Sequence, residues 1–412
     1  MAGKKKKGKG KGKKITEYEL RKNLRAQARQ RDFEDMEDKL KIGKDPAEYA
    51  KEIRFGGVEG GGSHSTLILM DGVGTPLTEV EGPETNHWAL GIDETAARIA
   101  AMVQRGKENI GMPESVPLDA LGLCLSGCEE EESNRILANA MREHYPNTAK
   151  DYFIASDTVG ALKTAFDNGG VVLIAGTGSN ASMITNDGKT ITCGGWGYML
   201  GDEGSAYWIA HRACKYVFDD IDGLFPAPKP ISYIWPALRT FFKVASREEI
   251  LPHWYANFNK TKLANFTMEV VTGCKKEDLL SLHLMKEAGE ILAEHVVALA
   301  KKAPRALKLA NGGLKIICVG SVWKSWIYIK DSFLNKIHDS NALDELSLYH
   351  LTVSAAIGAC YSAAEKINWA FPKPYNKNSE IFYHYRRENY VKPVEKIKSQ
   401  PVLVPCNTAS GN

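Results

Sequence analysis

Two glycine-rich turns are the first feature of this sequence that could do chemistry. Glycines 60–62 lead into Ser63, and residues 176–178 place Thr177 between two glycines. A glycine turn between strands presents several backbone N–H groups to an anion with no side chain in the way. Either turn alone is also typical of an ordinary tight hairpin. Because the two turns stand in matching contexts, we predict that they bracket a polyphosphate, although no Walker sequence is present.

The carboxylate of Asp157 is the candidate general base. It follows the apolar run 152–156 and comes directly before a helical pattern that starts at Thr158. In layered α/β folds this end of a strand is where ligands bind. A carboxylate there can accept the proton of a hydroxyl group as a phosphoryl group is transferred. The structural alternative is that Asp157 is the N-cap of the following helix.

A glycine-rich segment, C-G-G-W-G-Y-M-L-G-D-E-G-S, covers residues 193–205. Five glycines in thirteen residues exclude a plain helix or strand, and they allow a loop to approach a ligand closely. Trp196 can supply an apolar surface beside that ligand. Asp202 and Glu203 stand before a helical pattern, where they either bind sugar hydroxyls or cap the helix.

Asn86 is a second candidate for reading a polar ligand. It lies in the run T-N-H-W at 85–88, and its amide pairs a donor with an acceptor as hydroxyl and acetamido groups require. The alternative is a turn residue beside a packing Trp88. His87 has no partner at metal-ligand spacing, so we assign no metal ligand.

The elements that position these residues follow a pattern that occurs twice. Each copy reads as strand, glycine turn, strand, Asp-Gly turn and strand. Such a long-period repeat predicts two related lobes. The copies cover 55–81 and 171–193; further buried strands are expected at 121–125, 152–156 and 315–319, and helices at 129–144, 158–166, 204–218, within 232–310 and at 351–369.

The composition indicates a soluble globular protein of two or three cores. The 412 residues are 43% apolar and 25% charged, and no run of eighteen apolar residues is present to span a bilayer. The N-terminus lacks the apolar stretch of a secretory signal. The eight cysteines match no zinc spacing, so we expect reduced thiols in a cytoplasmic protein.

The net charge of +3 conceals a basic N-terminal arm. Residues 1–54 carry 18 basic and 10 acidic residues, whereas the remainder carries 35 and 40. Eight lysines among residues 1–14 predict a segment that is disordered when free, followed by one marginal helix within 15–42. We expect the arm to bind a polyanion such as RNA, a microtubule or another acidic surface; the alternative is a solvated tail with no partner.

Six motifs together resemble a known family. V-E-G-G-G-S, L-S-G, S-D-T-V-G, G-T-G-S-N, C-G-G-W-G-Y-M-L-G-D-E-G-S-A-Y-W-I-A-H and V-G-S-V-W-K-S-W occur in the order found in eukaryotic N-acetylglucosamine kinases. These belong to the BadF/BadG branch of the sugar kinase/Hsp70/actin superfamily. The resemblance covers about 54–370. It implies an α/β fold of two actin-like, ribonuclease H-like lobes with an ATP and sugar cleft between them, and a homodimer.

The resemblance also implies roles for individual residues. Asp157 is the base that accepts the O6 proton of N-acetyl-D-glucosamine, and Mg²⁺ accompanies the ATP. His64 and Cys128 depart from the family pattern beside the first phosphate turn and after L-S-G, where they could alter ATP affinity. The implied sugar-binding residues are Asn86, Asp157, Gly195, Trp196, Gly197 and Asp202, and the implied ATP-binding residues are Ser63, Thr177, Gly320 and Ser321.

The predicted organisation has five parts: the arm at 1–53, a small lobe at 54–167, a large lobe at 168–350, a closing helix at 351–370 that returns to the small lobe, and a polar tail at 371–412. Three alternatives stay open. One is a kinase for glucosamine or a broader set of amino sugars, including N-acetylmannosamine and muropeptides. Another is an ATPase that activates a dehydratase through an iron–sulphur cluster, which requires closely placed thiolates. The last is a structural or binding protein anchored by its arm.

Overall fold

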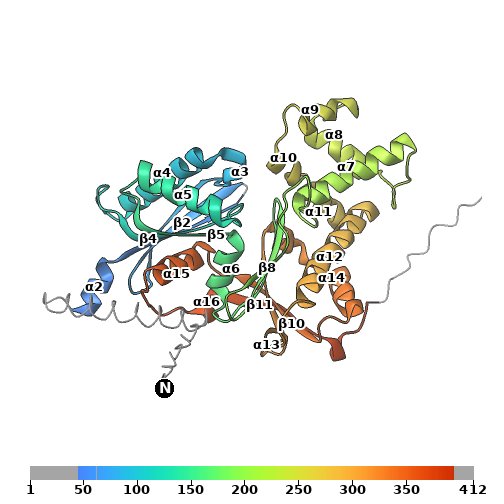
Figure 1. Cartoon of the computed structure of the whole chain (residues 1–412). Coiled ribbons are helices and arrows are strands. Elements are labelled where there is room, and N and C mark those ends of the chain that lie inside the picture. The colour runs from blue at the N-terminus through green and yellow to red at the C-terminus, as the bar shows by residue number, and fades with distance from the viewer. Residues whose placement is uncertain (1–44, 62, 394–412) are drawn as a thin grey trace, which may run out of the picture.

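The computed structural model describes residues 45–61 and 63–393, which form two α/β lobes side by side (Figure 1). The arm at 1–44 and the end of the tail at 394–412 lie outside the described residues. A short helix, α2 (Pro46–Glu52), leads into the small lobe and is capped by the Asp45 side chain.

The small lobe is built on a five-stranded sheet of order β3-β2-β1-β4-β5. The first three strands form an antiparallel meander, and β4 and β5 run parallel to β1. The strands are β1 (Arg54–Gly60), β2 (His64–Asp71), β3 (Pro76–Pro83), β4 (Leu118–Leu125) and β5 (Ala149–Ala155), and the helices are α3 (His87–Leu90), α4 (Ile92–Asn109), α5 (Glu131–His144) and α6 (Asp157–Ala165).

The large lobe repeats this topology and carries one additional strand. Its sheet has the order β11-β10-β9-β6-β7-β8, with an antiparallel meander from β6 to β8 and parallel strands β9 and β10. The strands are β6 (Gly170–Ala175), β7 (Ser179–Ile184), β8 (Thr190–Gly194), β9 (Leu314–Val319), β10 (Glu345–Leu351) and β11 (Ser379–Arg386).

Removing β11 leaves the same strand order in both lobes, so the predicted internal repeat is confirmed.

Helices inserted between β8 and β9 form most of the larger core. They are α7 (Ala206–Asp222), α8 (Ile234–Phe242), η1 (Glu248–Ile250), α9 (Leu251–Trp254), α10 (Lys260–Asn265), α11 (Thr267–Lys275), α12 (Leu279–Ala300) and α13 (Arg305–Lys308); η2 (Ser321–Ser325) and α14 (Trp326–Ser340) follow β9.

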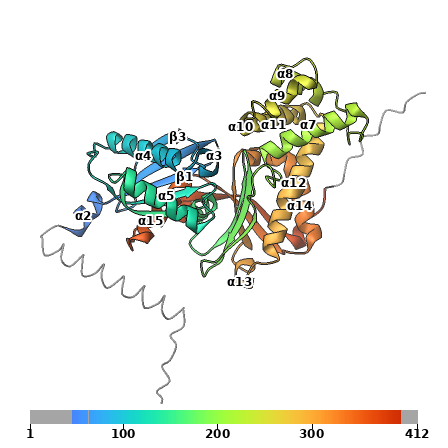
Figure 2. The same cartoon turned by 45° about the horizontal axis from the view of Figure 1, so that its top comes forward.

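The helix α15 (Ala356–Lys366) packs on the small lobe although it stands in the chain between β10 and β11 of the large-lobe sheet (Figure 2). Glycines make this approach possible. A Cβ atom at Gly57 or Gly122 would overlap the carbonyl oxygens of Ala356 and Ala359 respectively. A Cβ atom at Gly358 would overlap a carbonyl oxygen of α6. The chain therefore crosses back to the first lobe through a tight contact between α15, the small-lobe sheet and α6.

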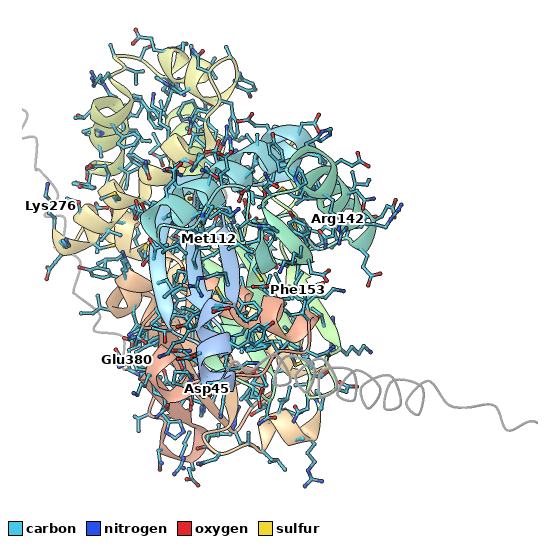
Figure 3. The ribbon with its side chains drawn as sticks, turned by 90° about the vertical axis from the view of Figure 1, so that its left-hand side faces the viewer. Asp45, Met112, Arg142, Phe153, Lys276 and Glu380 are labelled. Carbon is cyan, nitrogen blue, oxygen red and sulfur yellow. The ribbon has the colours of Figure 1, made fainter. Side chains whose placement is uncertain are left out.

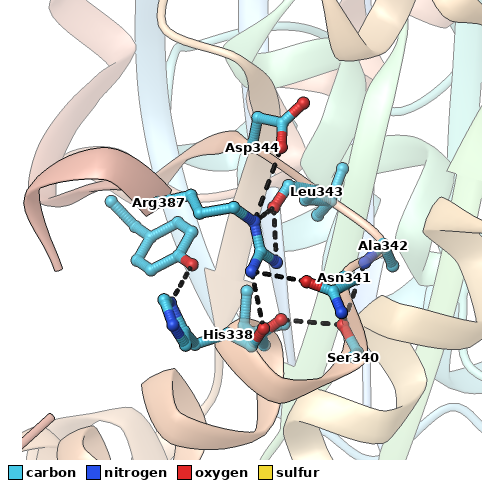
Figure 4. Close-up of polar contacts among 9 residues, drawn as sticks. His338, Ser340, Asn341, Ala342, Leu343, Asp344 and Arg387 are labelled. Atoms are coloured by element: carbon cyan, nitrogen blue, oxygen red, sulfur yellow. Dashed lines mark hydrogen bonds and ion pairs between the residues drawn. The ribbon is translucent and has the colours of Figure 1, made fainter.

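Part of the segment that we expected to be a polar tail has regular structure. After α16 (Tyr375–Asn378), β11 pairs antiparallel with β10, and η3 (Arg387–Asn389) follows it. The guanidinium of Arg387 donates hydrogen bonds to the carbonyl oxygens of His338 and Leu343 and to Asn341 Oδ1 (Figure 4). These contacts fasten the segment to the end of α14, so residues 379–389 belong to the large lobe.

Charged side chains project from the outer faces of both lobes. Figure 3 shows Arg142 at the margin of the small lobe and Lys276 projecting from the helical region. Within the described ranges, no helix is long and apolar enough to cross a membrane.

Candidate active site

The two glycine turns predicted to bracket a polyphosphate face each other across the lobes. Ser63 Oγ, at the β1–β2 turn, lies 3.1 Å from Thr177 Oγ1 at the β6–β7 turn. The second turn is closed by a hydrogen bond of 2.9 Å from the Gly176 N–H to the Gly178 carbonyl. The duplicated topology therefore brings one hydroxyl from each copy to the same point between the lobes.

A third element touches the second turn. Gly320 follows β9 with φ +105°, a conformation that favours glycine. A Cβ atom there would overlap the backbone of Ala175 and Gly176. Ser321 begins η2, and the Trp323 indole N–H holds that segment by donating to the Leu173 carbonyl at 3.2 Å. The structure thus places Gly320 and Ser321 next to the turn that carries Thr177.

Asp157 is the first residue of α6, directly after β5. The helix N-cap position belongs to Ser156, so Asp157 is not the cap. The Ser156 hydroxyl lies 3.1 Å from Asp157 Oδ1 and 3.2 Å from Glu129 Oε1. Burial, and then the negative charge of Glu129, raises the pKa of Asp157 to about 7. A carboxylate with such a pKa is suited to act as a base near neutral pH.

Glu59 is a third carboxylate at this location. Glu59 is the last residue but one of β1, directly before the first glycine turn. Its Oε2 accepts hydrogen bonds of 3.1 Å from the Ser354 hydroxyl and the Ala355 N–H. Burial raises the pKa of Glu59, and its charge contributes to the raised pKa of Asp157. We did not identify Glu59 or Glu129 from the sequence, although Glu59 stands inside the motif V-E-G-G-G-S.

Asn86 is held at the same edge of the small lobe. Its Oδ1 accepts the Trp88 N–H at 3.0 Å as the N-cap of α3, so the turn role considered above is present. The Trp88 indole N–H donates to the Gly127 carbonyl at 2.9 Å. Trp88 is nevertheless 69% exposed. Gly127 has φ +95° and lies against the Asn86 amide. Asn86 is therefore anchored beside the loop that follows β4.

The predicted sugar loop begins at the end of β8. Gly194, Gly195 and Gly197 have φ values of +84°, +81° and +74°, so this path requires glycine. A Cβ atom at Gly195 would lie 2.6 Å from Asn180 Oδ1 on β7. The Trp196 residue is 71% exposed, so its ring is free to contact a ligand. This group lies on the large lobe, whereas Asn86 and Asp157 lie on the small lobe.

Asp202 occupies a position that the sequence did not reveal. Its buried carboxylate accepts the Ser179 N–H at 3.0 Å through Oδ1, and its Oδ2 lies 2.7 Å from Lys260 Nζ. A Cβ atom at Gly178 would lie 2.7 Å from Asp202 Oδ1, so the carboxylate lies against the second phosphate turn. The following helix α7 is capped by Ser205, so the capping role considered for Asp202 and Glu203 is wrong.

The two departures from the family pattern differ in their surroundings. Cys128 is buried, and its Sγ lies 3.8 Å from His87 Nδ1. Burial, then the charges of Glu129 and Asp157, raises the pKa of Cys128 to about 12, so it remains a thiol. His64 is exposed at the start of β2, one residue after the hydroxyl of Ser63.

A fold of two duplicated lobes with paired glycine turns and a carboxylate between them defines a phosphotransferase-type ATPase of the actin-like class. The family model described as the BadF/BadG/BcrA/BcrD ATPase family matches residues 57–362, and the chain belongs to this family. The predicted family and fold class are thereby confirmed.

The sequence identity to individual relatives is low. An N-acetylmuramic acid/N-acetylglucosamine kinase of Clostridium acetobutylicum is 25% identical over 279 residues, which cover 67% of this chain and 88% of the relative. An N-acetyl-D-glucosamine kinase of Dictyostelium discoideum is 29% identical over 185 residues, 43% of this chain and 57% of the relative. A solved structure from Chromobacterium violaceum, provisionally described as an N-acetylglucosamine kinase, matches with a TM-score of 0.59 at 23% identity, over 76% of this chain and 99% of that one. The structural likeness shows the fold alone.

Proposed function

We propose that this protein transfers the γ-phosphate of ATP to O6 of N-acetyl-D-glucosamine. The observation that carries the proposal is the position of Asp157, a carboxylate with a pKa near 7 at the end of β5. It lies in the lobe that contributes Ser63 to the paired phosphate turns. The names of the two curated relatives support an amino sugar as the acceptor.

In the proposed reaction, Asp157 accepts the proton of the sugar hydroxyl as that oxygen attacks phosphorus. The turns at Ser63 and Thr177 hold the phosphates in line, with Gly320 and Ser321 beside the nucleoside. Asn86, Gly195, Trp196 and Gly197 orient the sugar from both lobes, whereas the carboxylate of Asp202 is already engaged by the Ser179 N–H and by Lys260. Closure of the lobes around both substrates would exclude water and limit hydrolysis of ATP.

Mg²⁺ fits the carboxylates at this point. In kinase sites Mg²⁺ is bound by one or two carboxylates together with phosphates and water, rather than by a cage of protein ligands. Within the described ranges, no group of three or more His, Cys, Asp or Glu residues could hold a metal ion alone. Glu59, which directly precedes the first turn and whose Oε2 accepts hydrogen bonds from the Ser354 hydroxyl and the Ala355 N–H, is the residue that would hold Mg²⁺. Bound there with ATP, the ion would neutralise charge on the phosphates.

The cysteines weigh against the dehydratase-activating alternative. Six of the seven cysteines in the described part of the chain are buried inside the lobes, and Cys193 is partly buried. A cluster shared between subunits needs thiolates at the surface. Burial raises the pKa of Cys214 and of Cys360, which keeps them protonated.

The acceptor range is tested by comparing sugars under identical conditions. We expect kcat/KM for N-acetylglucosamine to exceed that for glucose at least about fivefold, because a site that pairs the acetamido group leaves its polar atoms unmatched by a hydroxyl, at a cost of about 1–3 kcal/mol. ADP release with N-acetylglucosamine, glucosamine, N-acetylmannosamine and glucose provides the measurement. Equal values for glucose and N-acetylglucosamine would contradict the assignment, and a preference for glucosamine would favour the broader amino-sugar kinase.

Other expectations remain proposals. These are the division into lobes at 54–167 and 168–350, the homodimer, the cytoplasmic location and the polyanion-binding arm at 1–53. The lysine cluster of the arm supports the last of these.

A further inference from the structure

We infer that Lys260 and Thr261, at the start of α10, form a third wall of the triphosphate site and bind the terminal phosphates of ATP. This inference rests on the proposed function, because it assigns further residues to the same nucleotide site. Neither residue belongs to a glycine motif. They reach the site from the helical region inserted between β8 and β9, and Figures 1 and 2 show α10 at the side of that region nearest the small lobe.

The first support is a row of three hydroxyl groups from three separate segments. Ser63 Oγ lies 3.1 Å from Thr177 Oγ1 and also 3.1 Å from Thr261 Oγ1. Each hydroxyl has one donor hydrogen and two acceptor lone pairs. Phosphate oxygens offer only acceptors, so all three hydroxyls could donate to a phosphate group placed among them. Thr261 therefore belongs to the same cluster of hydroxyl groups as Ser63 and Thr177, the residues assigned to the phosphates from the two glycine turns.

The second support is the position of the Lys260 ammonium group. A Cβ atom placed on Gly178 would lie 2.9 Å from Lys260 Nζ, so the amine sits directly beside the second phosphate turn. The turn offers only neutral donors to a triphosphate that carries several negative charges. Charge-assisted hydrogen bonds are about twice as strong as neutral ones. Lys260 therefore supplies the positive charge that the two turns lack.

The ion pair with Asp202 explains how Lys260 is held there. The Asp202 side chain is 4% exposed and fixed by the Ser179 N–H, whereas the Lys260 side chain is 29% exposed. The ammonium group thus lies between a buried carboxylate and open space. It has three donor hydrogens, so the contact with Asp202 leaves others for a ligand. Asp202 acts as a positioning residue for Lys260 in this arrangement.

Nucleotide binding measured by calorimetry without sugar tests the assignment. We expect Lys260→Met to weaken binding of a non-hydrolysable ATP analogue with Mg²⁺ at least about tenfold, the usual scale for a charged hydrogen bond. Binding of AMP, which lacks the terminal phosphates, should stay within about twofold of the wild type. Lys260→Arg should recover part of the loss.

Two further variants keep the test independent of folding. Lys262 lies on the same helix, but its amine contacts His253 at 3.1 Å, so Lys262→Met is the matched control and should bind the ATP analogue as the wild type does. Thr261→Val leaves the ion pair of Lys260 intact and should weaken binding of the analogue about threefold or more, without affecting binding of AMP. If Lys260→Met does not fold, the result for Thr261→Val alone tests the inference.

The inference is overturned if Lys260→Met and Thr261→Val bind the ATP analogue like the wild type, or if they lose affinity for the analogue and for AMP equally. The second result would indicate a structural role. Failure of the wild type to bind any adenine nucleotide would instead overturn the proposed function itself, so the two failures are distinguishable.

Discussion

Replacing Asp157 with asparagine is expected to lower kcat at least about 100-fold, the usual scale for loss of a general base. Asparagine preserves the shape and the hydrogen bond with Ser156 but cannot accept a proton from the sugar. Affinity for N-acetylglucosamine should change little, because the acceptor still finds a polar group of the same size. Steady-state kinetics with calorimetry of sugar binding separate these two effects.

The matched control is Asp93→Asn, which removes an exposed carboxylate from the first turn of α4 and should leave kcat unchanged. Thermal unfolding excludes a folding defect in the Asp157 variant. Because burial raises the pKa of Asp157 in the folded state, its ionisation costs stability above pH 7. The variant should therefore be at least as stable as the wild type at about pH 8, and this difference should vanish in acid, where the carboxyl is protonated in both states. Wild-type kcat in Asp157→Asn would remove Asp157 from the reaction.

The second large effect concerns pH. Since Asp157 must be ionised to accept a proton and its pKa is about 7, kcat/KM for the sugar should fall about tenfold for each pH unit below 7. Activity should level off above that value. At about pH 5 the loss approaches 100-fold, whereas a carboxylate with an ordinary pKa near 4 would still be ionised.

Saturating ATP and Mg²⁺ keep the nucleotide from contributing to this profile. The residual activity of Asp157→Asn serves as the control, because it should lack the step near pH 7. A profile of the wild type that stays flat between about pH 5 and 8 would show that the base is a group with an unperturbed pKa.

The strands and turns of this protein could be predicted because their signals are local. The meander pattern, with its glycine and Asp-Gly turns, located β1 to β3 and β6 to β8, and the duplication followed from its recurrence. We did not predict α4, although its buried face has helical spacing. The strand β11 was missed for a physical reason. Prolines precede it, and its ladder to β10 depends on a distant segment, which local propensity does not report.

The residues of the candidate site also fall into those that the sequence indicates and those that only the tertiary structure reveals. Glycine motifs and the strand-end carboxylate identified the turns and Asp157, because close backbone approach and strand ends leave marks in the sequence. Lys260 and Thr261 carry no such signal in the sequence. They stand on a six-residue helix whose Leu263 and Ala264 are buried in the larger core, so their position beside the turns depends on tertiary packing. The pairing of Asp202 with Lys260 joins residues far apart in the chain, so only tertiary structure reveals it.

The most direct test of the central claim is to identify the product. The full-length protein is incubated with ATP, Mg²⁺ and N-acetylglucosamine, and the reaction is followed by phosphorus and proton NMR. The proposed reaction yields a phosphomonoester whose phosphorus couples to the two protons on C6, formed in equal amount with ADP and absent with Asp157→Asn. Phosphorylation at another hydroxyl, or release of inorganic phosphate with no phosphorylated sugar, would contradict it.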